Sequence, residues 1–319
     1  MKKHLLSATA ALLLICTGAQ AQKIGQLSNV TRLTNSTERF ENPRWSPDGS
    51  KIAFTQFGYE GLYVMDAKGA SKKLLTDGSG AGYGFQWSAD SKEILYRDTR
   101  WLDTGNGYQD RAHAIWAVDM VGKRTRMTYD ANYMQPAAWR YSAGGVKSIV
   151  APDAKIVKGV SLTKIPASMA KKAAANSNNV SFIANGETLV IVNAAGVKNT
   201  IFNAPAVCPA ISPNGKKIAF VNEDIIYVMN IDGTGKVKIG YGFNPSWVGN
   251  TQLVFEKTTD DGHEYTSGEF FIVNVNGTGV KALTATSGNI EMCPCVSPDG
   301  SKLVFVSYTD GQVYSADLK

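Results

Sequence analysis

One short stretch decides the fold: Asn42-Pro43-Arg44-Trp45-Ser46-Pro47-Asp48-Gly49-Ser50-Lys51-Ile52-Ala53-Phe54. Its middle has the chemistry of a tight turn, because proline presets φ, aspartate favours the next position and glycine accepts a positive φ. Apolar, aromatic and β-branched residues flank the turn, as they do in paired strands. The stretch therefore predicts a β-hairpin.

This hairpin recurs along the chain. Clear copies occupy residues 85–96, 209–220 and 294–305, and weaker copies centre on Trp139 and Trp247. Repetition at a period of a few tens of residues is typical of propellers and solenoids, in which each repeat is one supersecondary unit. The repeat is therefore the level at which the fold has to be interpreted.

A second hairpin follows the first, so the unit has four antiparallel strands, A to D. The D strands carry an apolar residue at six places: Leu33, Leu75, Met127, Ile201, Ile239 and Leu283. Their separations run from 38 residues to 74, near the ~40–45 of a four-stranded propeller blade plus insertions. We predict an all-β, six-bladed β-propeller of four-stranded antiparallel blades, since a two-sheet sandwich would not need six copies of one unit.

The ends of the chain complete each other in this scheme. The D strand near Leu33 precedes every A strand, whereas the last unit has A, B and C strands (C at residues 312–316) but no D strand. Residues 31–34 are therefore predicted to pair with residues 312–316. This pairing closes the ring with an N-terminal strand and removes two exposed sheet edges.

Composition fits a folded β protein. The chain has 319 residues, of which 44% are hydrophobic and 10% aromatic, and it contains 31 glycines; these values exclude a disordered chain. The net charge of +6 is too small for an electrostatic footprint on nucleic acid. No apolar run after the N-terminus reaches membrane length.

Residues 1–21 have the pattern of a secretory signal peptide: two lysines, a short apolar run and a small-x-small end at Ala19-Gln20-Ala21. Residues 22–319 then form a single propeller domain, exported to the periplasm or secreted. The alternatives are an amphipathic N-terminal helix and a lipid anchor at Cys16. Ile15 argues against the anchor, because a small residue normally precedes a lipidated cysteine.

Three cysteines remain after removal of residues 1–21, an odd number that excludes a dense disulfide framework. We expect no bond between Cys293 and Cys295, because two positions along an extended strand lie near the upper limit for bridging. Buried free thiols are the expected state. A bridge from Cys208 across the channel mouth is the alternative.

The Trp-Ser-Pro-Asp-Gly pattern of residues 45–49, followed by Tyr-Val-Met-Asp at residues 63–66, resembles the repeats of TolB propellers, a WD-type family. The resemblance covers essentially residues 22–319 and implies a periplasmic adaptor of the cell envelope. The same blades occur in scaffold proteins, peptidase propellers and a pectic lyase family. TolB proteins carry an α/β domain before the propeller, whereas Gln22 leads directly into blade strands, so that domain's roles are not carried over.

The insertions all belong to one face. In such a blade the A–B and C–D turns lie on one face, and the B–C loops and D-to-A links lie on the other, here named the B–C face. Insertions occur at residues 97–111, 151–179 and 258–265. The second is lysine-rich and includes a predicted short helix at residues 166–175, for which we favour a solvated face over contact with a membrane surface.

Long loops on a rigid scaffold usually carry binding, and arginine and aromatic residues dominate interface energies. Residues that precede A strands, Met292 among them, are expected to ring the channel mouth on the same face. The predicted partner-binding residues combine both groups: Tyr83, Arg97, Arg100, Trp101, Tyr108, Gln135, Phe243 and His263. For the segment around Trp101, folding of the loop onto its own blade is the equal alternative.

Catalytic and metal chemistry find little support in the sequence. There is no Gly-x-Ser-x-Gly elbow, no P-loop or dinucleotide fingerprint, and neither His113 nor His263 has a nucleophile signature nearby. The acidic residues 260–264 could bind a divalent ion, although a solvated loop tip explains them more simply. We expect no cofactor, no catalytic residue and no metal site.

The predicted function is that of a non-catalytic, monomeric binding or scaffold protein. Its partner would be an envelope protein or peptide, or else a glycan, bound on the B–C face. The rival hypothesis is a carbohydrate-active enzyme resembling the pectic lyases, which would need histidines and acids converging at the channel. A third hypothesis is a purely structural module within a larger assembly.

Overall fold

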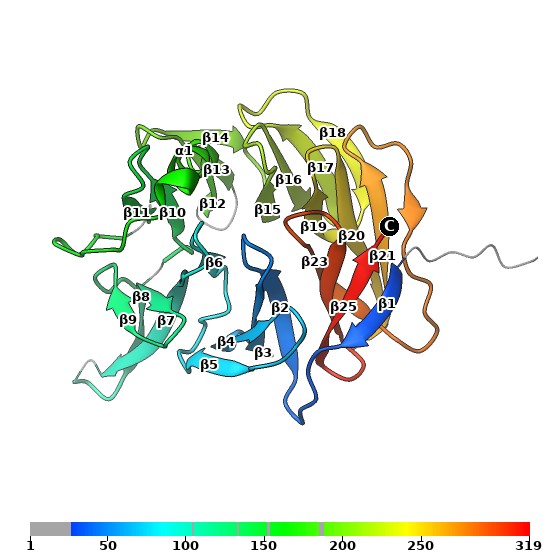
Figure 1. Cartoon of the computed structure of the whole chain (residues 1–319), viewed down its shortest axis with the longest axis horizontal. Helices are drawn as coiled ribbons and strands as arrows, with labels where there is room; N and C mark the ends of the chain where they lie inside the picture. Colours follow the sequence, from blue (N-terminus) through cyan, green and yellow to red (C-terminus); the bar gives the residue numbers. More distant parts are fainter. Residues whose placement is uncertain (1–26, 104, 133, 152–153, 185–187) are drawn as a thin grey trace, which may run out of the picture.

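The structure, a computed structural model, describes residues 27–103, 105–132, 134–151, 154–184 and 188–319. Its antiparallel sheets follow one another in a ring around a common axis (Figure 1). The predicted signal peptide lies outside the described residues. Among the residues described, no helix is long and apolar enough to cross a membrane.

Five of the six predicted blades are single four-stranded sheets. Blade 1 comprises β2 (Phe40–Trp45), β3 (Lys51–Gln56), β4 (Glu60–Asp66) and β5 (Lys73–Thr76). Blade 2 comprises β6 (Gln86–Trp87), β7 (Glu93–Asp103), β8 (Gln109–Asp119) and β9 (Arg124–Arg126). Blade 4 comprises β15 (Val207–Ile211), β16 (Lys217–Asn222), β17 (Ile225–Asn230) and β18 (Val237–Tyr241). Blade 5 comprises β19 (Phe243–Val248), β20 (Gln252–Asp260), β21 (Tyr265–Asn274) and β22 (Lys281–Ala282). Blade 6 comprises β23 (Glu291–Val296), β24 (Lys302–Ser307), β25 (Gln312–Leu318) and the N-terminal β1 (Leu27–Arg32).

The third predicted blade, which spans the longest interval between D strands, is divided. It contains a two-stranded sheet of β10 (Ala138–Tyr141) and β11 (Lys147–Val150), then α1 (Ala167–Asn176), then a three-stranded sheet of β12 (Val180–Ala184), β13 (Thr188–Val192) and β14 (Lys198–Phe202). The six-bladed all-β prediction is confirmed, but this blade is built from two sheets and is not one four-stranded sheet. The 74-residue interval accommodates both.

The predicted ring closure is confirmed. β1 pairs antiparallel with β25, with Thr31 opposite Ser315 and Arg32 opposite Tyr314. Beyond the strand, the Leu33 N–H donates to the Val313 carbonyl over 2.8 Å. In Figure 1 the blue first strand lies beside the red last strand. Two segments at opposite ends of the sequence thus complete one sheet.

The repeated turn is held by its serine and its acid. The Ser46 hydroxyl donates to Asp48 over 2.6 Å and accepts from the Lys51 N–H over 2.9 Å, while Gly49 has a φ of 70°. The same pair recurs as Ser88 with Asp90, Ser212 with Asn214 and Ser297 with Asp299. Turn chemistry that the sequence displays is therefore used in the same way in four blades.

The core lies between neighbouring blades. Phe40, Phe54 and Met65 of blade 1 pack against Val304 and Val313 of blade 6, all of them buried. The helix predicted at residues 166–175 is α1, and its buried alanines join the cluster of blades 2 and 3. The lysine-rich insertion is therefore partly a core element and not only a solvated face.

Two of the predicted insertion loops are strands. In blade 2, β7 and β8 remain paired as far as Asp103 opposite Gln109. In blade 5, β20 and β21 remain paired as far as Asp260 opposite Tyr265. The insertions at residues 97–111 and 258–265 are thus long β-hairpins, because each continues the strand pairing of its own blade.

Candidate functional site

An aromatic cavity of about 650 Å³ lies where several blades meet. Its lining includes residues just before or within the A strands of four blades: Glu41, Cys208, Phe243, Asn244, Met292 and Cys293. The B–C turns contribute Phe57, Tyr59 and Asp224, and the adjoining strand ends of blade 5 contribute Asp260 and Tyr265. A hollow lined from blades 1, 4, 5 and 6 must lie at the ring axis on the B–C face. We call it the channel-mouth cavity.

The backbone beneath this cavity has one feature repeated four times. Asn42, Cys208, Asn244 and Cys293 each have a φ between 49° and 56° and each precedes a proline. At each of them the strand pairing shifts register, as a β-bulge does. These residues also line a narrow hollow of about 90 Å³ that continues the channel. We did not predict this element, although the repeated Asn-Pro and Cys-Pro pairs were its signal.

Glu256 of β20 borders the cavity and is 2% exposed. Its carboxylate accepts the Cys293 backbone N–H over 2.5 Å and the Asn244 side-chain amide over 2.8 Å. Burial raises the pKa of Glu256 to about 7, against the lowering effect of these two hydrogen bonds. The group is therefore poised between its neutral and charged forms near neutral pH.

The other charges around the cavity are mostly acidic. Glu41, Asp224 and Asp260 line it together with Glu256, against the single arginine Arg39. Burial also raises the pKa of Glu41, which accepts the Tyr59 N–H over 2.7 Å. The lining thus offers a surplus of carboxylates to a bound group.

The aromatic rings stand in pairs around these acids. Tyr59 meets Tyr83 edge to face at 5.6 Å, and Tyr241 meets Phe243 in the same way at 5.6 Å. Tyr265 meets Tyr308 at 5.3 Å. Edge-to-face contacts are a preferred geometry for aromatic pairs and fix the orientation of the rings around the cavity.

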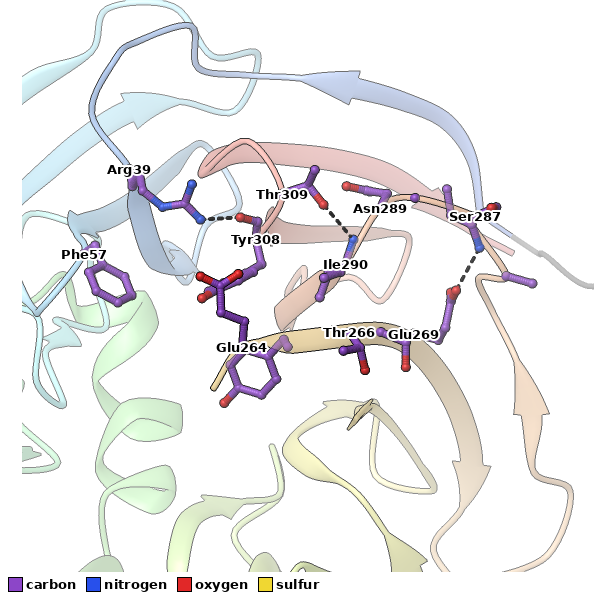
Figure 2. A pocket seen from close by; sticks show the side chains of 15 residues that line it. Arg39, Phe57, Glu264, Thr266, Glu269, Ser287, Asn289, Ile290, Tyr308 and Thr309 are labelled. Atoms are coloured by element: carbon purple, nitrogen blue, oxygen red, sulfur yellow. Dashed lines mark hydrogen bonds between the residues drawn. The ribbon is translucent and has the colours of Figure 1, made fainter. Parts of the chain in front are cut away.

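A second hollow of about 910 Å³ adjoins the cavity between blades 5 and 6 (Figure 2). It shares Arg39, Phe57, Tyr265 and Tyr308 with the channel-mouth cavity. The Arg39 guanidinium lies 5.2 Å from the Tyr308 ring centroid and donates to the Tyr308 carbonyl. We call this hollow the blade 5–6 groove.

The structure brings some of the predicted binding residues to the cavity. Phe243 and Met292 line it. Tyr83 is one ring away, against Tyr59, and the Arg97 guanidinium lies 4.5 Å from the Tyr83 ring centroid. Contacts from Tyr59 through Tyr83 to Arg97 thus lead from the cavity to blade 2.

Other predicted residues lie elsewhere. Arg100, Trp101 and Tyr108 are exposed on the outer part of the β7–β8 hairpin or its tip, with Arg100 ion-paired to Asp130. Trp101 is 57% exposed and lies under the Arg111 guanidinium, so it does not plug its own blade. These residues form a separate surface.

Gln135 and the two histidines also lie outside the cavity lining. Gln135 is buried. His263 is exposed at the tip of the β20–β21 hairpin. His113 lies in β8 against the Thr99 hydroxyl, and burial, helped by nearby arginines, lowers its pKa.

The acidic loop at residues 260–264 organises itself. The Asp261 carboxylate accepts the backbone N–H groups of His263 and Glu264, each over 2.9 Å. Within the described part of the chain, no group of three or more histidine, cysteine or acidic side chains converges in a way that could hold a metal ion. The three described cysteines are free thiols, as predicted, but they are not the buried thiols expected: Cys208 is exposed, and Cys293 and Cys295 are only partly buried.

Comparison with known proteins agrees with the architecture. No family model matches the chain. A protein TolB homologue of Chlorobium luteolum is 30% identical over 126 residues, which are 35% of this chain and 27% of that relative. The chain thus spans about a quarter of the length of this relative.

Solved structures extend the likeness to the whole ring. A putative TolB from Agrobacterium tumefaciens aligns with a TM-score of 0.54 at 16% identity, covering 91% of this chain and 97% of that one. TolB from Acinetobacter baumannii aligns with a TM-score of 0.50 at 15% identity, covering 89% of this chain and 56% of that one. At such identities the likeness shows the fold, and the chain is a TolB-like β-propeller.

Proposed function

We propose that this TolB-like propeller is a non-catalytic periplasmic binding protein that takes a segment of an envelope protein into its channel-mouth cavity. The observation that carries the proposal is the cavity itself. About 650 Å³ of space is bordered by aromatic rings and by the buried carboxylate of Glu256. Binding sites are typically apolar hollows with a few convergent polar groups.

A protein segment suits this lining better than a glycan does. Aromatic faces and carboxylates together favour a cationic group such as a lysine or arginine side chain, which a neutral glycan lacks. The backbone of an extended segment would follow the rim from Tyr59 towards Phe243. We infer a partner segment with at least one basic residue and one apolar anchor.

A binding role also agrees with the placement of the groups that catalysis would need. A lyase-like site would bring histidines and acids together at the channel. His113 lies in blade 2 against Thr99, and His263 lies at the tip of the blade 5 hairpin. The carboxylates of the cavity have no histidine beside them in its lining.

Site-specific photo-crosslinking in the native envelope tests the proposal. A photo-crosslinking residue replaces Tyr59, which is 41% exposed at the cavity, or Val121, which is 78% exposed on the opposite turns. We expect a protein partner to be captured from position 59 and not from position 121. Capture only from position 121 would place the working surface on the other face. Capture of a saccharide from position 59 would mean that the partner is a glycan and not a protein.

A further inference from the structure

Two carboxylates from neighbouring blades meet beside the blade 5–6 groove. Glu269 lies in β21 of blade 5, and Glu291 begins β23 of blade 6. Glu291 is 3% exposed, and Glu269 is half-buried at the wall of the groove, where Figure 2 shows its carboxylate extending to the backbone beside Ser287. Neither residue lines the channel-mouth cavity.

The backbone brings the two strands together at this point. Gly268 and Ile290 form a parallel bridge between the segments that carry the two acids. A Cβ at Gly268 would lie 2.9 Å from the Glu291 carbonyl oxygen, so only glycine permits the approach. The side-by-side position of Glu269 and Glu291 is thus fixed by main-chain contact.

Each acid uses only one of its two oxygens. Glu269 Oε1 accepts the Thr286 N–H over 2.9 Å, and Glu291 Oε1 accepts the Asn289 side-chain amide over 3.0 Å. The Oε2 atoms of both residues are buried and have no hydrogen-bond partner among the described residues. Buried polar atoms are nearly always satisfied, so both oxygens need a partner.

Burial and the charge of Glu269 raise the pKa of Glu291 to about 7. Two adjacent carboxylates out of water repel each other unless a proton or a cation lies between them. The two carboxylates lie within hydrogen-bond reach of each other, so one shared proton would satisfy both free oxygens but leave one negative charge buried. A divalent cation would bind both oxygens and neutralise both charges. The charge that a shared proton would leave buried favours the divalent cation.

The side chains around the acid pair offer oxygen atoms as possible ligands for a cation. Asn289 Oδ1 accepts the Ser307 hydroxyl over 2.6 Å, and the Thr286 side chain lowers the pKa of Glu291 as a hydrogen-bonding neighbour. Hydroxyl, amide and carboxylate oxygens are ligands for hard cations such as Ca²⁺, and no soft ligand is present in this set.

Water can complete the coordination from both sides. Glu269, Thr286 and Asn289 line the groove of about 910 Å³, while Glu291 and Ser307 line a neighbouring hollow of about 360 Å³. A Ca²⁺ ion takes six to eight oxygen ligands and commonly keeps waters among them. Two carboxylates with neutral oxygens and water are therefore a workable set.

We propose that Glu269 and Glu291 bind a Ca²⁺ ion that holds blade 5 against blade 6. The ion neutralises the acid pair and joins two sheets whose main chains already touch at Gly268. Because blade 6 also contains the closing strand β1, the ion stabilises the blade through which the ring is closed.

The test uses the full-length protein, stripped with EDTA and transferred to pH 7.5. Thermal melting and isothermal calorimetry follow addition of CaCl₂ alone, with MgCl₂ as the comparison. We expect one calorimetric site and a rise in Tm of roughly 5–10 °C at a hundredfold excess over Kd. MgCl₂ should raise Tm less, because Mg²⁺ gives up its waters reluctantly.

Variants separate this site from other acids. Glu291→Gln should abolish the Ca²⁺-dependent rise, yet melt in EDTA at or above the wild-type temperature because the repulsion is gone. Glu269→Gln should do the same. Glu264→Gln changes an exposed acid of the same groove and should keep the full response.

Three results would overturn the proposal. The wild type could show no Ca²⁺ dependence while its Tm falls with rising pH near neutrality more steeply than the Tm of Glu291→Gln, which would mean a proton shared by Glu269 and Glu291. Glu291→Gln and Glu269→Gln could retain the Ca²⁺ response. Glu264→Gln could lose it, which would move the ion to the acidic hairpin tip.

Discussion

At the residue scale, a left-handed residue before a proline shapes the centre of the molecule. At Asn42 and Asn244 this conformation is tolerated because asparagine visits it readily. Cys208 and Cys293 hold the same φ without that advantage, at a cost of roughly 1–2 kcal/mol each. The bulge turns the main-chain N–H of Cys293 towards Glu256, so local strain and the buried acid belong to one arrangement.

Glu256 makes stability depend on pH with a definite sign. Its pKa is about 7 in the folded chain against an ordinary value of 4.5. Between these values the folded state holds a proton that the unfolded state has released, so stability falls as pH rises from 4.5 to 7. The fall attributable to this group is on the order of 3 kcal/mol.

Glu256→Gln should therefore reduce the fall in Tm between pH 5 and pH 8, measured by thermal melting in EDTA. Glu291 adds a fall of the same sign, because its pKa is also raised to about 7, and it persists in the variant. Glu264→Gln, at an exposed position, should leave the wild-type slope unchanged. An unaltered slope in Glu256→Gln would show that the buried acid does not titrate in this range.

Tyr59 and Phe243 are predicted to anchor the partner segment. Replacement of either by alanine should weaken binding of the crosslinked partner by about 2 kcal/mol, measured by calorimetry. Tyr59 is the cleaner test, because it is 41% exposed and Phe243 packs partly into the core of blades 4 and 5. Trp101→Ala, on the separate β7–β8 surface, should weaken binding less. A larger loss from Trp101 would move the site to that hairpin.

At the element scale, the sequence predicted the turns but not the length of the strands. The turn at Ser46 and Asp48 depends on side chains adjacent in sequence, so the sequence shows it directly. The extension of β7 to Asp103 depends on pairing with β8. Its residues are largely polar and carry no local alternation, and a cross-strand partner is not visible in a local pattern. For this reason the sequence predicts loops at residues 97–111 and 258–265, where the structure has long hairpins.

The candidate site shows the same division. Phe243 and Met292 could be placed at the channel mouth because they precede A strands in the repeat. Glu256 could not, since it lies within a B strand and becomes significant only when the bulge at Cys293 meets it from the next blade. Gln135 occupies an equivalent position in sequence but is buried, in the region where the third blade is divided.

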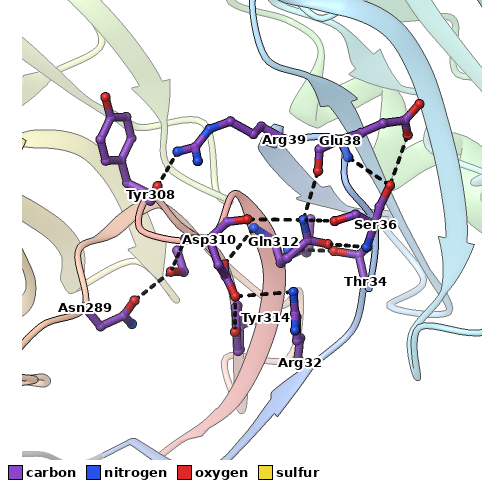
Figure 3. A network of polar contacts seen from close by, with 12 residues as sticks. Arg32, Thr34, Ser36, Glu38, Arg39, Asn289, Tyr308, Asp310, Gln312 and Tyr314 are labelled. Atoms are coloured by element: carbon purple, nitrogen blue, oxygen red, sulfur yellow. Dashed lines mark hydrogen bonds and ion pairs between the residues drawn. The ribbon is translucent and has the colours of Figure 1, made fainter.

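The side chain of Gln312 links β25 to the segment that follows β1 through hydrogen bonds. Its fully buried amide donates to the carbonyls of Ser36 and Glu38 over 3.1 and 2.9 Å and accepts the Ser36 N–H over 3.1 Å (Figure 3). Gln312→Ala leaves these backbone groups without partners. It should cost about 3 kcal/mol in urea unfolding.

The matched control is Gln252→Ala, because the Gln252 amide donates to the Asn274 side chain and is only partly buried. This change should cost less than about 1 kcal/mol. Equal losses in the two variants would mean that the link at Gln312 contributes no more than an ordinary partly exposed hydrogen bond.

At the scale of the whole molecule, the six D strands of the sequence predicted a six-bladed ring. The one unusually long interval between D strands corresponds to the blade that is divided into two sheets. The 74 residues between Met127 and Ile201 hold two sheets and a helix. The weak copy at Trp139 makes only a two-stranded sheet, and α1 buries Ala170 and Ala173 beside it. A repeat pattern detects blades that keep their turn chemistry, so it missed this division.

Closure of the ring is the property on which the whole molecule depends. Deleting residues 23–34 removes β1 and Leu33, which is buried among blades 1 and 6. The β25 edge then loses its ladder bonds, at about 1 kcal/mol each, and the core beneath Val313 opens. We expect Tm to fall by roughly 10 °C or more, and the exposed edge to promote self-association. Deleting residues 23–26 alone leaves β1 in place and should change neither melting nor the sedimentation coefficient. If the deletion of residues 23–34 also melted like the full chain, pairing of the first and last strands would not be what stabilises the ring. The blades would then be stable with two open sheet edges.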